Sequence, residues 1–273
     1  MSRARNTAAV SAVAVCALTM TAHADWTVVN LHPVGAASSY AYDVYGGQQV
    51  GEAGGRASLW TGSAASWVDL TPAGATESVA NGMHGGQQVG SAAVGGWWSH
   101  AGLWTGTPAS WMDLHPAGAI LSDALGVYGG QQVGRAYVNG ILRASLWSGS
   151  AASWVDLHPA GATESTARGV YGGQQVGYAC MGVSHAGLWT GSAASWVDLH
   201  PAGAASSVCE GVYGSQQVGT VYVGGGGPRA SLWTGSAASW VDLTPAGGNV
   251  VGSLRRVRRP AGGLRLARRH RSR

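Results

Sequence analysis

The sequence predicts an all-β protein, a five-bladed β-propeller built from four-stranded repeats of about 43 residues. The motif GGQQVG begins at residues 46, 85, 129 and 172 and returns as GSQQVG at residue 214, and an LWTG or LWSG segment follows each copy. The tryptophans of the second motif lie 44, 43, 42 and 44 residues apart. Gly, Ser and Pro interrupt every run that could form a long helix. Near-identical units at this period favour a radial or stacked repeat architecture.

The fourth copy shows the elements expected in one repeat. Its expected strands are residues 167–171, 174–178, 185–190 and 195–199. Gly172 and Gly173 join the first two strands as a tight hairpin, because glycine adopts positive φ without steric cost. Pro201 ends the fourth strand, since proline cannot donate to a ladder. A parallel β-solenoid is the competing architecture, but its coils are usually shorter and lack an antiparallel hairpin.

One segment of the repeat occurs six times rather than five. The copies of this DLHP-like segment lie at residues 30–33, 69–72, 113–116, 156–159, 198–201 and 242–245. If each pairs with the LW strand before it, the first copy is surplus. It could close the ring or lie outside it, and an open array that associates with another chain is a further alternative.

The two ends of the chain differ from the repeats and define the domain organisation. Residues 1–24 are expected to be a signal peptide, with Arg3 and Arg5 before a short apolar stretch and AHA at residues 22–24. That stretch is too short to span a bilayer, so no transmembrane segment is expected in the mature chain. Residues 25–247 form the five-repeat domain, and residues 248–273 an Arg-rich disordered tail. The protein is therefore expected to be secreted, periplasmic or at the cell surface.

The charge distribution argues against nucleic acid as a partner. The formal net charge is +4, but nine of the sixteen basic residues lie between residues 255 and 273. Residues 25–254 carry five arginines and all twelve acidic residues. The body is acidic, whereas nucleic-acid binding needs a basic face on the folded part.

Two cysteines, Cys180 and Cys209, remain in the predicted mature chain. An oxidising compartment would permit a disulfide between them, although two cysteines are too few for a disulfide scaffold. Their spacing does not show whether they meet, so the bridge is a possibility only.

The order of motifs resembles a known family. The signal peptide, the glycine-flanked QVG strand and the HAGLW segments at His100 and His185, each before a D-L turn, are similar to the HAF family of extracellular repeat proteins. The resemblance covers residues 28–247, although the chain has no Phe and three copies read RASLW. It implies export and a β-rich repeat fold, and it implies no reaction and no catalytic residue. The glycine doublet is similar to that of kelch blades at the level of the fold.

Tryptophan is the first candidate for ligand contacts. A pair flanks every GSAAS-type turn, so each pair is expected to touch across the two strands. At least one member of each pair is expected to pack between blades, while exposed members would offer flat platforms for sugar rings. The candidate platforms are Trp60, Trp104, Trp147, Trp189 and Trp233.

A second candidate set is the alternating Arg and His that opens each LW strand. We expect it to pair with the repeated Asp of the DLHP-like segment. Its members are Arg56, His100, Arg143, His185 and Arg229. The Asp itself is expected to cap the turn before Pro rather than bind cations or sugar hydroxyls.

The His of the DLHP-like segment could form a metal ring, at residues 32, 115, 158 and 200. Because Thr71 and Thr244 replace it in two copies, we expect it to hydrogen-bond a turn, and we expect no metal or other cofactor. One Gln of each QQ pair points inward and is expected to bond within the ladder or between blades.

The chain carries no GxSxG, HExxH, P-loop or CxxC motif. Almost every candidate side chain is copied five times, whereas an active site needs a few unlike groups, and the unrepeated acids such as Asp43 and Glu210 look scattered. The sequence therefore predicts a non-catalytic binding or structural interaction module with an unknown extracellular protein or carbohydrate as partner. The alternatives are a multivalent carbohydrate-binding lectin, an enzyme whose unlike polar groups converge in the central channel, and a purely structural repeat protein.

Overall fold

The structure, a computed structural model, describes residues 27–225 and 227–246. The predicted signal peptide and the Arg-rich tail lie outside the described residues. The described part contains twenty strands in five four-stranded antiparallel sheets, each formed by one repeat. This confirms the predicted all-β, propeller-like architecture of five blades.

Within each sheet the strands follow chain order. The first blade contains β1 (Ser39–Tyr45), β2 (Gln48–Ala53), β3 (Arg56–Trp60) and β4 (Val68–Asp69). The second contains β5 (Ala75–His84), β6 (Gln87–Val94), β7 (Ser99–Trp104) and β8 (Met112–Asp113). The third contains β9 (Leu121–Tyr128), β10 (Gln131–Val138), β11 (Ile141–Trp147) and β12 (Val155–Asp156). The fourth contains β13 (Ser165–Tyr171), β14 (Gln174–Cys180), β15 (Ser184–Trp189) and β16 (Val197–Asp198). The fifth contains β17 (Ala204–Tyr213), β18 (Gln216–Val223), β19 (Gly227–Trp233) and β20 (Val241–Asp242).

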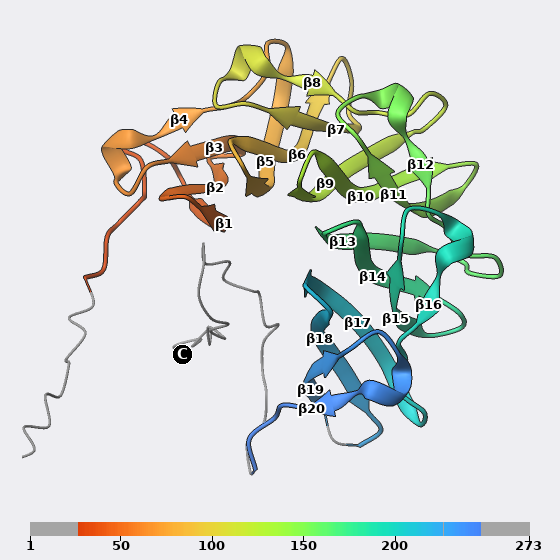
Figure 1. The fold of residues 1–273 in the computed structure, drawn as a ribbon. Helices are drawn as coiled ribbons and strands as arrows, with labels where there is room; N and C mark the ends of the chain where they lie inside the picture. Colours follow the sequence, from red (N-terminus) through yellow and green to blue (C-terminus); the bar gives the residue numbers. More distant parts are fainter. Residues whose placement is uncertain (1–26, 226, 247–273) are drawn as a thin grey trace, which may run out of the picture.

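The blades are arranged around an axis, with the first strand of each sheet innermost and the short fourth strand outermost (Figure 1). The arc is open between the first and fifth blades (Figure 1). Four apolar clusters fill the four junctions between consecutive blades in the described residues. On the open face of the fifth blade, Leu232 and Leu243 are half-buried, whereas their counterparts Leu188 and Leu199 are buried at a junction.

The surplus segment at residues 30–33 lies against the first blade. The His32 Nδ1 atom is 2.9 Å from Ser39 Oγ at the start of β1. The Asn30 side chain accepts the His32 N–H at 2.9 Å, as the Asp does in complete blades. The segment therefore covers the leading face of the first blade like the end of a preceding blade.

The glycine doublets form the predicted two-residue hairpins. Tyr171 pairs with Gln174, and φ is +55° at Gly172 and +80° at Gly173. Positive φ at both central residues is the geometry of a turn whose twist matches the flanking strands. This tight turn fixes the register of the two inner strands.

The fourth strand is shorter than predicted: β16 covers two residues instead of 195–199. A one-turn 3₁₀ helix at Ala193–Ser195 occupies its expected start, held by Ser195 Oγ, which donates to Ser192 O at 2.6 Å. At the other end, the Asp198 side chain accepts the His200 N–H at 2.8 Å and turns the chain. Equivalent 3₁₀ turns lie at Ala64–Ser66, Pro108–Ser110, Ala151–Ser153 and Ala237–Ser239.

Each junction is built from the same apolar residues. At the third junction, Leu146 and Leu157 of the third blade pack with Val170 and Trp189 of the fourth. A second contact links the inner strands, whose last residues form a chain of rings with centroids 4.4 to 4.5 Å apart. These rings are Tyr45, His84, Tyr128, Tyr171 and Tyr213. Aromatic pairs in this range add to the stability that burial gives.

Candidate functional site

Every inner strand carries a β-bulge at the same place. In each repeat the strand contains an Ala, or Cys209 in the fifth blade, and the pairing register shifts between this residue and the one two positions later. One residue is thereby left without a partner on the neighbouring strand. A bulge bends its strand and redirects the side chain of the extra residue. The bulge residues are Tyr42, Asn81, Leu125, Arg168 and Glu210. The repeat thus places a different side chain at one structural position in each blade.

The last glycine of each GGQQVG motif makes room for the bulge. A Cβ added at Gly177 would lie 1.9 Å from the carbonyl oxygen of Thr166 and 2.9 Å from Ala167 Cα. The equivalent glycines at residues 51, 90, 134 and 219 meet the same overlap at 1.8 to 2.1 Å. Both contacts are with backbone, so a side chain at this position cannot be accommodated by a rotamer change. The invariant glycine is therefore a requirement of the bulge.

All five bulge residues line one central cavity of about 320 Å³. The other polar side chains that line it include Asp43, Arg135, Thr166 and Tyr178. Two acidic and two basic groups line this space, and Arg135 also pairs with Asp123 at 2.9 Å. We define this cavity, with its five bulge residues and these four side chains, as the central site. Asp43 and Glu210, which look scattered in the sequence, are brought together here.

The shortest polar contact between side chains of the central site joins two blades. Arg168 Nη1 lies 2.5 Å from Glu210 Oε1, and the Arg168 guanidinium carbon lies 5.3 Å from the centroid of the Tyr178 ring. Burial alone would lower the pKa of Arg168, but the hydrogen bond and charge of Glu210 outweigh it and raise that pKa. Arg168 is therefore a fixed cation, held between a carboxylate and an aromatic ring.

Two further groups complete the central site. The Asp43 carboxylate accepts the backbone N–H of Val44 and that of Met83, both at 2.9 Å, and so joins the first two blades. Thr166 is 2% exposed, and its hydroxyl is buried without a hydrogen-bond partner in the structure. Thr166 is therefore a buried polar residue of the lining whose hydroxyl the fold leaves unpaired, as it leaves the indole nitrogens of the buried tryptophans.

The five tryptophans predicted as platforms are buried at the blade junctions and at the leading face of the first blade, at 0 to 1% exposure. The predicted core packing is confirmed. Sugar contacts with these five indoles would require the blades to separate. Ring contact across the turn is observed for Trp104 with Trp111 and for Trp189 with Trp196, each at 4.6 Å.

The second tryptophan of each pair, which we call the outer tryptophan, packs according to whether a serine or a glycine faces it on the neighbouring strand. In the RASLW copies, Trp154 Nε1 donates to Ser145 Oγ at 2.9 Å, and the first and fifth blades repeat this bond. In the HAGLW copies a glycine replaces the serine, and a Cβ at Gly187 would lie 1.8 Å from the Trp196 ring. The Ser or Gly choice thus sets how the outer indole packs.

The alternating Arg and His pair with the repeated Asp in every blade, as predicted. The shortest distances are 2.7 Å at Arg56, 2.9 Å at His100, 2.7 Å at Arg143, 2.8 Å at His185 and 3.5 Å at Arg229. These pairs lie at the outer strands and share no residue with the central site. Exposed pairs of this kind contribute about 0 to 1 kcal/mol each.

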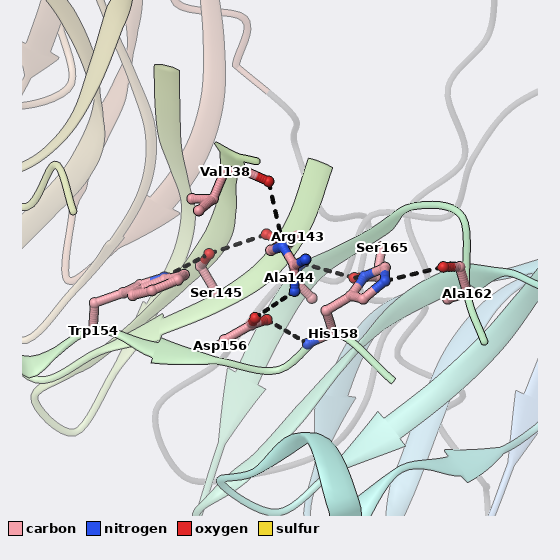
Figure 2. A network of polar contacts seen from close by, with 9 residues as sticks. All are labelled: Val138, Arg143, Ala144, Ser145, Trp154, Asp156, His158, Ala162 and Ser165. Atoms are coloured by element: carbon pink, nitrogen blue, oxygen red, sulfur yellow. Dashed lines mark hydrogen bonds and ion pairs between the residues drawn. The ribbon is translucent and has the colours of Figure 1, made fainter. Parts of the chain in front are cut away.

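Figure 2 shows the polar network around one such pair, at the third junction. Ala144 N–H donates to Ser165 Oγ of the next blade at 2.9 Å, and His158 Nδ1 lies 2.8 Å from the same oxygen. His158 Nε2 lies 3.0 Å from the carbonyl of Ala162. Because a carbonyl only accepts, Nε2 carries the proton and Nδ1 accepts from the serine. The DLHP histidines therefore brace a turn, as predicted.

The equivalent turns of the second and fourth blades, which contain His115 and His200, make stability depend on pH. Burial, followed by the neighbouring His100 and His185, lowers the pKa of His115 and His200 below 6.5. Between the lowered pKa and 6.5, these two histidines are more protonated in the unfolded chain than in the folded chain. The free energy of unfolding is therefore expected to fall as pH drops below 6.5. Replacing both histidines with Thr, the residue at position 71, should reduce this loss. Urea unfolding at pH 7.5, 6.5 and 5.5 measures it, and an unchanged pH dependence in the double variant would contradict the assignment.

The inward glutamines make the expected bonds. Gln175 Nε2 donates to Gly173 O at 2.9 Å, and its Oε1 accepts the Gly191 N–H at 2.8 Å. Gln217 Nε2 also reaches Gln174 Oε1 of the preceding blade at 3.2 Å. The buried glutamine therefore ties two turns of its own blade together and, here, two blades.

Cys180 and Cys209 are both free, so the possible disulfide is not formed. They lie in different blades, and burial raises the pKa of the Cys209 thiol far above its ordinary value. Cys209 stands where the other inner strands have Ala and packs in the fourth junction. Among the described residues no group of three or more His, Cys, Asp or Glu is suited to hold a metal ion.

No family model matches the chain, and no curated protein matches it. The resemblance to HAF repeats therefore stays a prediction. In residues 27–225 and 227–246, none of the helices has the length and apolar character that crossing a membrane requires. The central site is accordingly interpreted from its own chemistry.

Proposed function

We propose that this protein is a non-catalytic binding module that holds one small, hydroxyl-rich molecule, such as a monosaccharide, in the central site. The observation that carries the proposal is the convergence of five unlike bulge residues on one cavity of about 320 Å³. The five repeats share the same strands and glycine turns, whereas the bulge residue differs from one repeat to the next. Such a pattern is expected of a scaffold that presents side chains to a ligand.

The chemistry of the lining supports a neutral polar ligand. Asn81, Asp43 and Glu210 offer planar amide and carboxylate groups, and Arg168 offers several donors. Vicinal hydroxyls both donate and accept, so they match a lining that contains both kinds of group. Tyr178 adds an aromatic ring beside them. Each charged group of the lining is already in an ion pair or hydrogen-bonded to backbone, so the site offers little attraction to a simple cation or anion.

Two contacts support binding rather than catalysis. Glu210 is already paired with Arg168, and both oxygens of Asp43 already accept backbone N–H groups. A general base needs a carboxylate that is able to take a proton from the substrate. Carboxylates held in this way are better suited to orient hydroxyl groups.

We also propose that the protein acts outside the cytoplasm. The predicted signal peptide supports export to the periplasm, the cell surface or the medium. A sugar ligand would fit the lectin alternative in its chemistry but not in its valency, since the central site occurs once per chain. The partner is then a soluble or surface carbohydrate.

Thr166→Val tests the proposal through opposite effects on folding and binding. Valine keeps the shape of threonine, and Val79 and Val208 occupy the equivalent position in two other blades. Removing a buried hydroxyl that lacks a partner is expected to raise the free energy of unfolding by about 1 kcal/mol. The same change should weaken sugar binding about fivefold, because a ligand hydrogen bond is lost.

The measurements are urea unfolding and saturation-transfer NMR on the full chain, with glucose, galactose, mannose and N-acetylglucosamine as probes. Thr190→Val, at an exposed threonine in the same blade, is the matched control and should change neither value. Tryptophan emission should stay constant on binding, because no tryptophan lines the central site. If none of the four sugars binds, or if Thr166→Val binds as well as the wild type, the ligand class is wrong.

A further inference from the structure

A second pocket, of about 280 Å³, lies between the first and second blades. It shares no lining residue with the central site. Glu52 of β2 and Glu77 of β5 line it together with Trp97 and Trp98 from the loop between β6 and β7. We call this pocket, with these four side chains, the lateral site.

The two tryptophans of the lateral site differ from all the other described ones. Trp97 is 97% exposed and Trp98 is 58% exposed, whereas the other described tryptophans are buried or half-buried. They lie in a hairpin loop of residues 95–98, while the equivalent turn of the first blade has only Gly54 and Gly55. Exposed indoles with no role in the core are typical of an interaction site.

The charge of the lateral site is negative. Neither Glu52 nor Glu77 forms an ion pair with any described residue, and no basic side chain lines the pocket. Glu52 is half-buried, so water screens its charge less than that of an exposed carboxylate. The site therefore combines a negative potential with two aromatic faces.

This combination favours an organic cation over a metal ion. A hard metal ion takes six or more oxygen ligands, which two carboxylates do not supply, and it gains little from indole faces. A quaternary ammonium group is attracted to both the ring faces and the carboxylates, and its methyl groups cover apolar surface. We propose that the lateral site binds a quaternary ammonium group of the choline type, either free or as a lipid headgroup.

Calorimetry with the full chain tests the lateral site, using choline and its neutral carbon isostere 3,3-dimethyl-1-butanol as probes. Choline should bind at least about tenfold more tightly, since the two molecules differ only in charge. Emission from the exposed indoles should change on choline binding. Flotation with phosphatidylcholine vesicles, with and without excess free choline as competitor, distinguishes a lipid headgroup from a free ligand, and either source supports the proposal.

The variants Trp97→Ala, Trp98→Ala and Glu52→Gln should each weaken choline binding about threefold or more. Val183→Ala changes an exposed apolar residue at the equivalent hairpin of the fourth blade and is the matched control. Thermal melts followed by circular dichroism should be the same for both Trp variants and the wild type, because the indoles are outside the core. Equal affinity for choline and its isostere, or unchanged affinity in Trp97→Ala and Glu52→Gln, would overturn the proposal.

Discussion

Gly177→Ala is expected to destabilise the protein by about 3 kcal/mol or more. The new Cβ would lie 1.9 Å from the carbonyl oxygen of Thr166, a contact that only a shift of the inner strand can relieve. Such a shift removes the bulge at Arg168 and turns that side chain away from the central site. Urea unfolding gives the loss of stability, and sugar binding by the folded fraction reports the lost site.

Gly224→Ala is the matched control for this substitution. A Cβ at Gly224 meets nothing within 4 Å, and its φ lies outside the left-handed region. The control is expected to stay within about 1 kcal/mol of the wild type, because the main effect is on the unfolded chain. If the two alanine variants were equally stable, the bulge would not depend on the glycine.

Trp189→Ala should have a similarly large effect, about 3 to 5 kcal/mol. The Trp189 ring is fully buried and packs with Leu146 and Leu157 of the preceding blade, so its removal leaves a cavity between two blades. Stability in a repeat architecture depends on the contacts between neighbours, and this substitution weakens one of them directly. Urea unfolding followed by circular dichroism measures the change.

Trp196→Ala provides the comparison within the same blade. The Trp196 ring is half-buried and packs against Trp189 and over Gly187. It buries less apolar surface, so we expect a loss of roughly half that of Trp189→Ala. Equal losses at the two positions, or a larger loss at Trp196, would contradict the assignment of Trp189 as the core residue of the junction.

Much of the fold could be predicted from the sequence because its determinants are local and repeated. The glycine doublets define hairpins, the period defines the blade, and the Asp of the DLHP-like segment turns the chain where each fourth strand ends. The length of that strand could not be predicted, because Ser195 Oγ favours a 3₁₀ turn through bonds to its own backbone. The open arc also depends on contacts between distant blades, which a repeat pattern does not encode.

The central site was harder to find from the sequence, because repetition directs attention to the residues that are copied. The informative positions are the ones that change within a constant frame: Tyr42, Asn81, Leu125, Arg168 and Glu210. An alignment of the five copies would have singled out this column. The direction in which these five side chains point could not be predicted. Side chains alternate between the two faces of a regular strand, and a bulge breaks this alternation.

The exposed pair at Trp97 and Trp98 could have been found by the same comparison, since it interrupts the repeat in one copy only. The ion pair of Arg168 with Glu210 could not, because the two residues are 42 positions apart and meet only through the packing of neighbouring blades.

The most direct test of the central site is the stoichiometry of sugar binding by the full chain, measured by calorimetry with the tightest-binding of the four probe sugars. We expect one molecule per chain, and at least about tenfold weaker binding in Glu210→Gln, which keeps the shape of the side chain but removes its charge. A stoichiometry near five, or an unchanged affinity in Glu210→Gln, would contradict a single site formed by the five bulge residues.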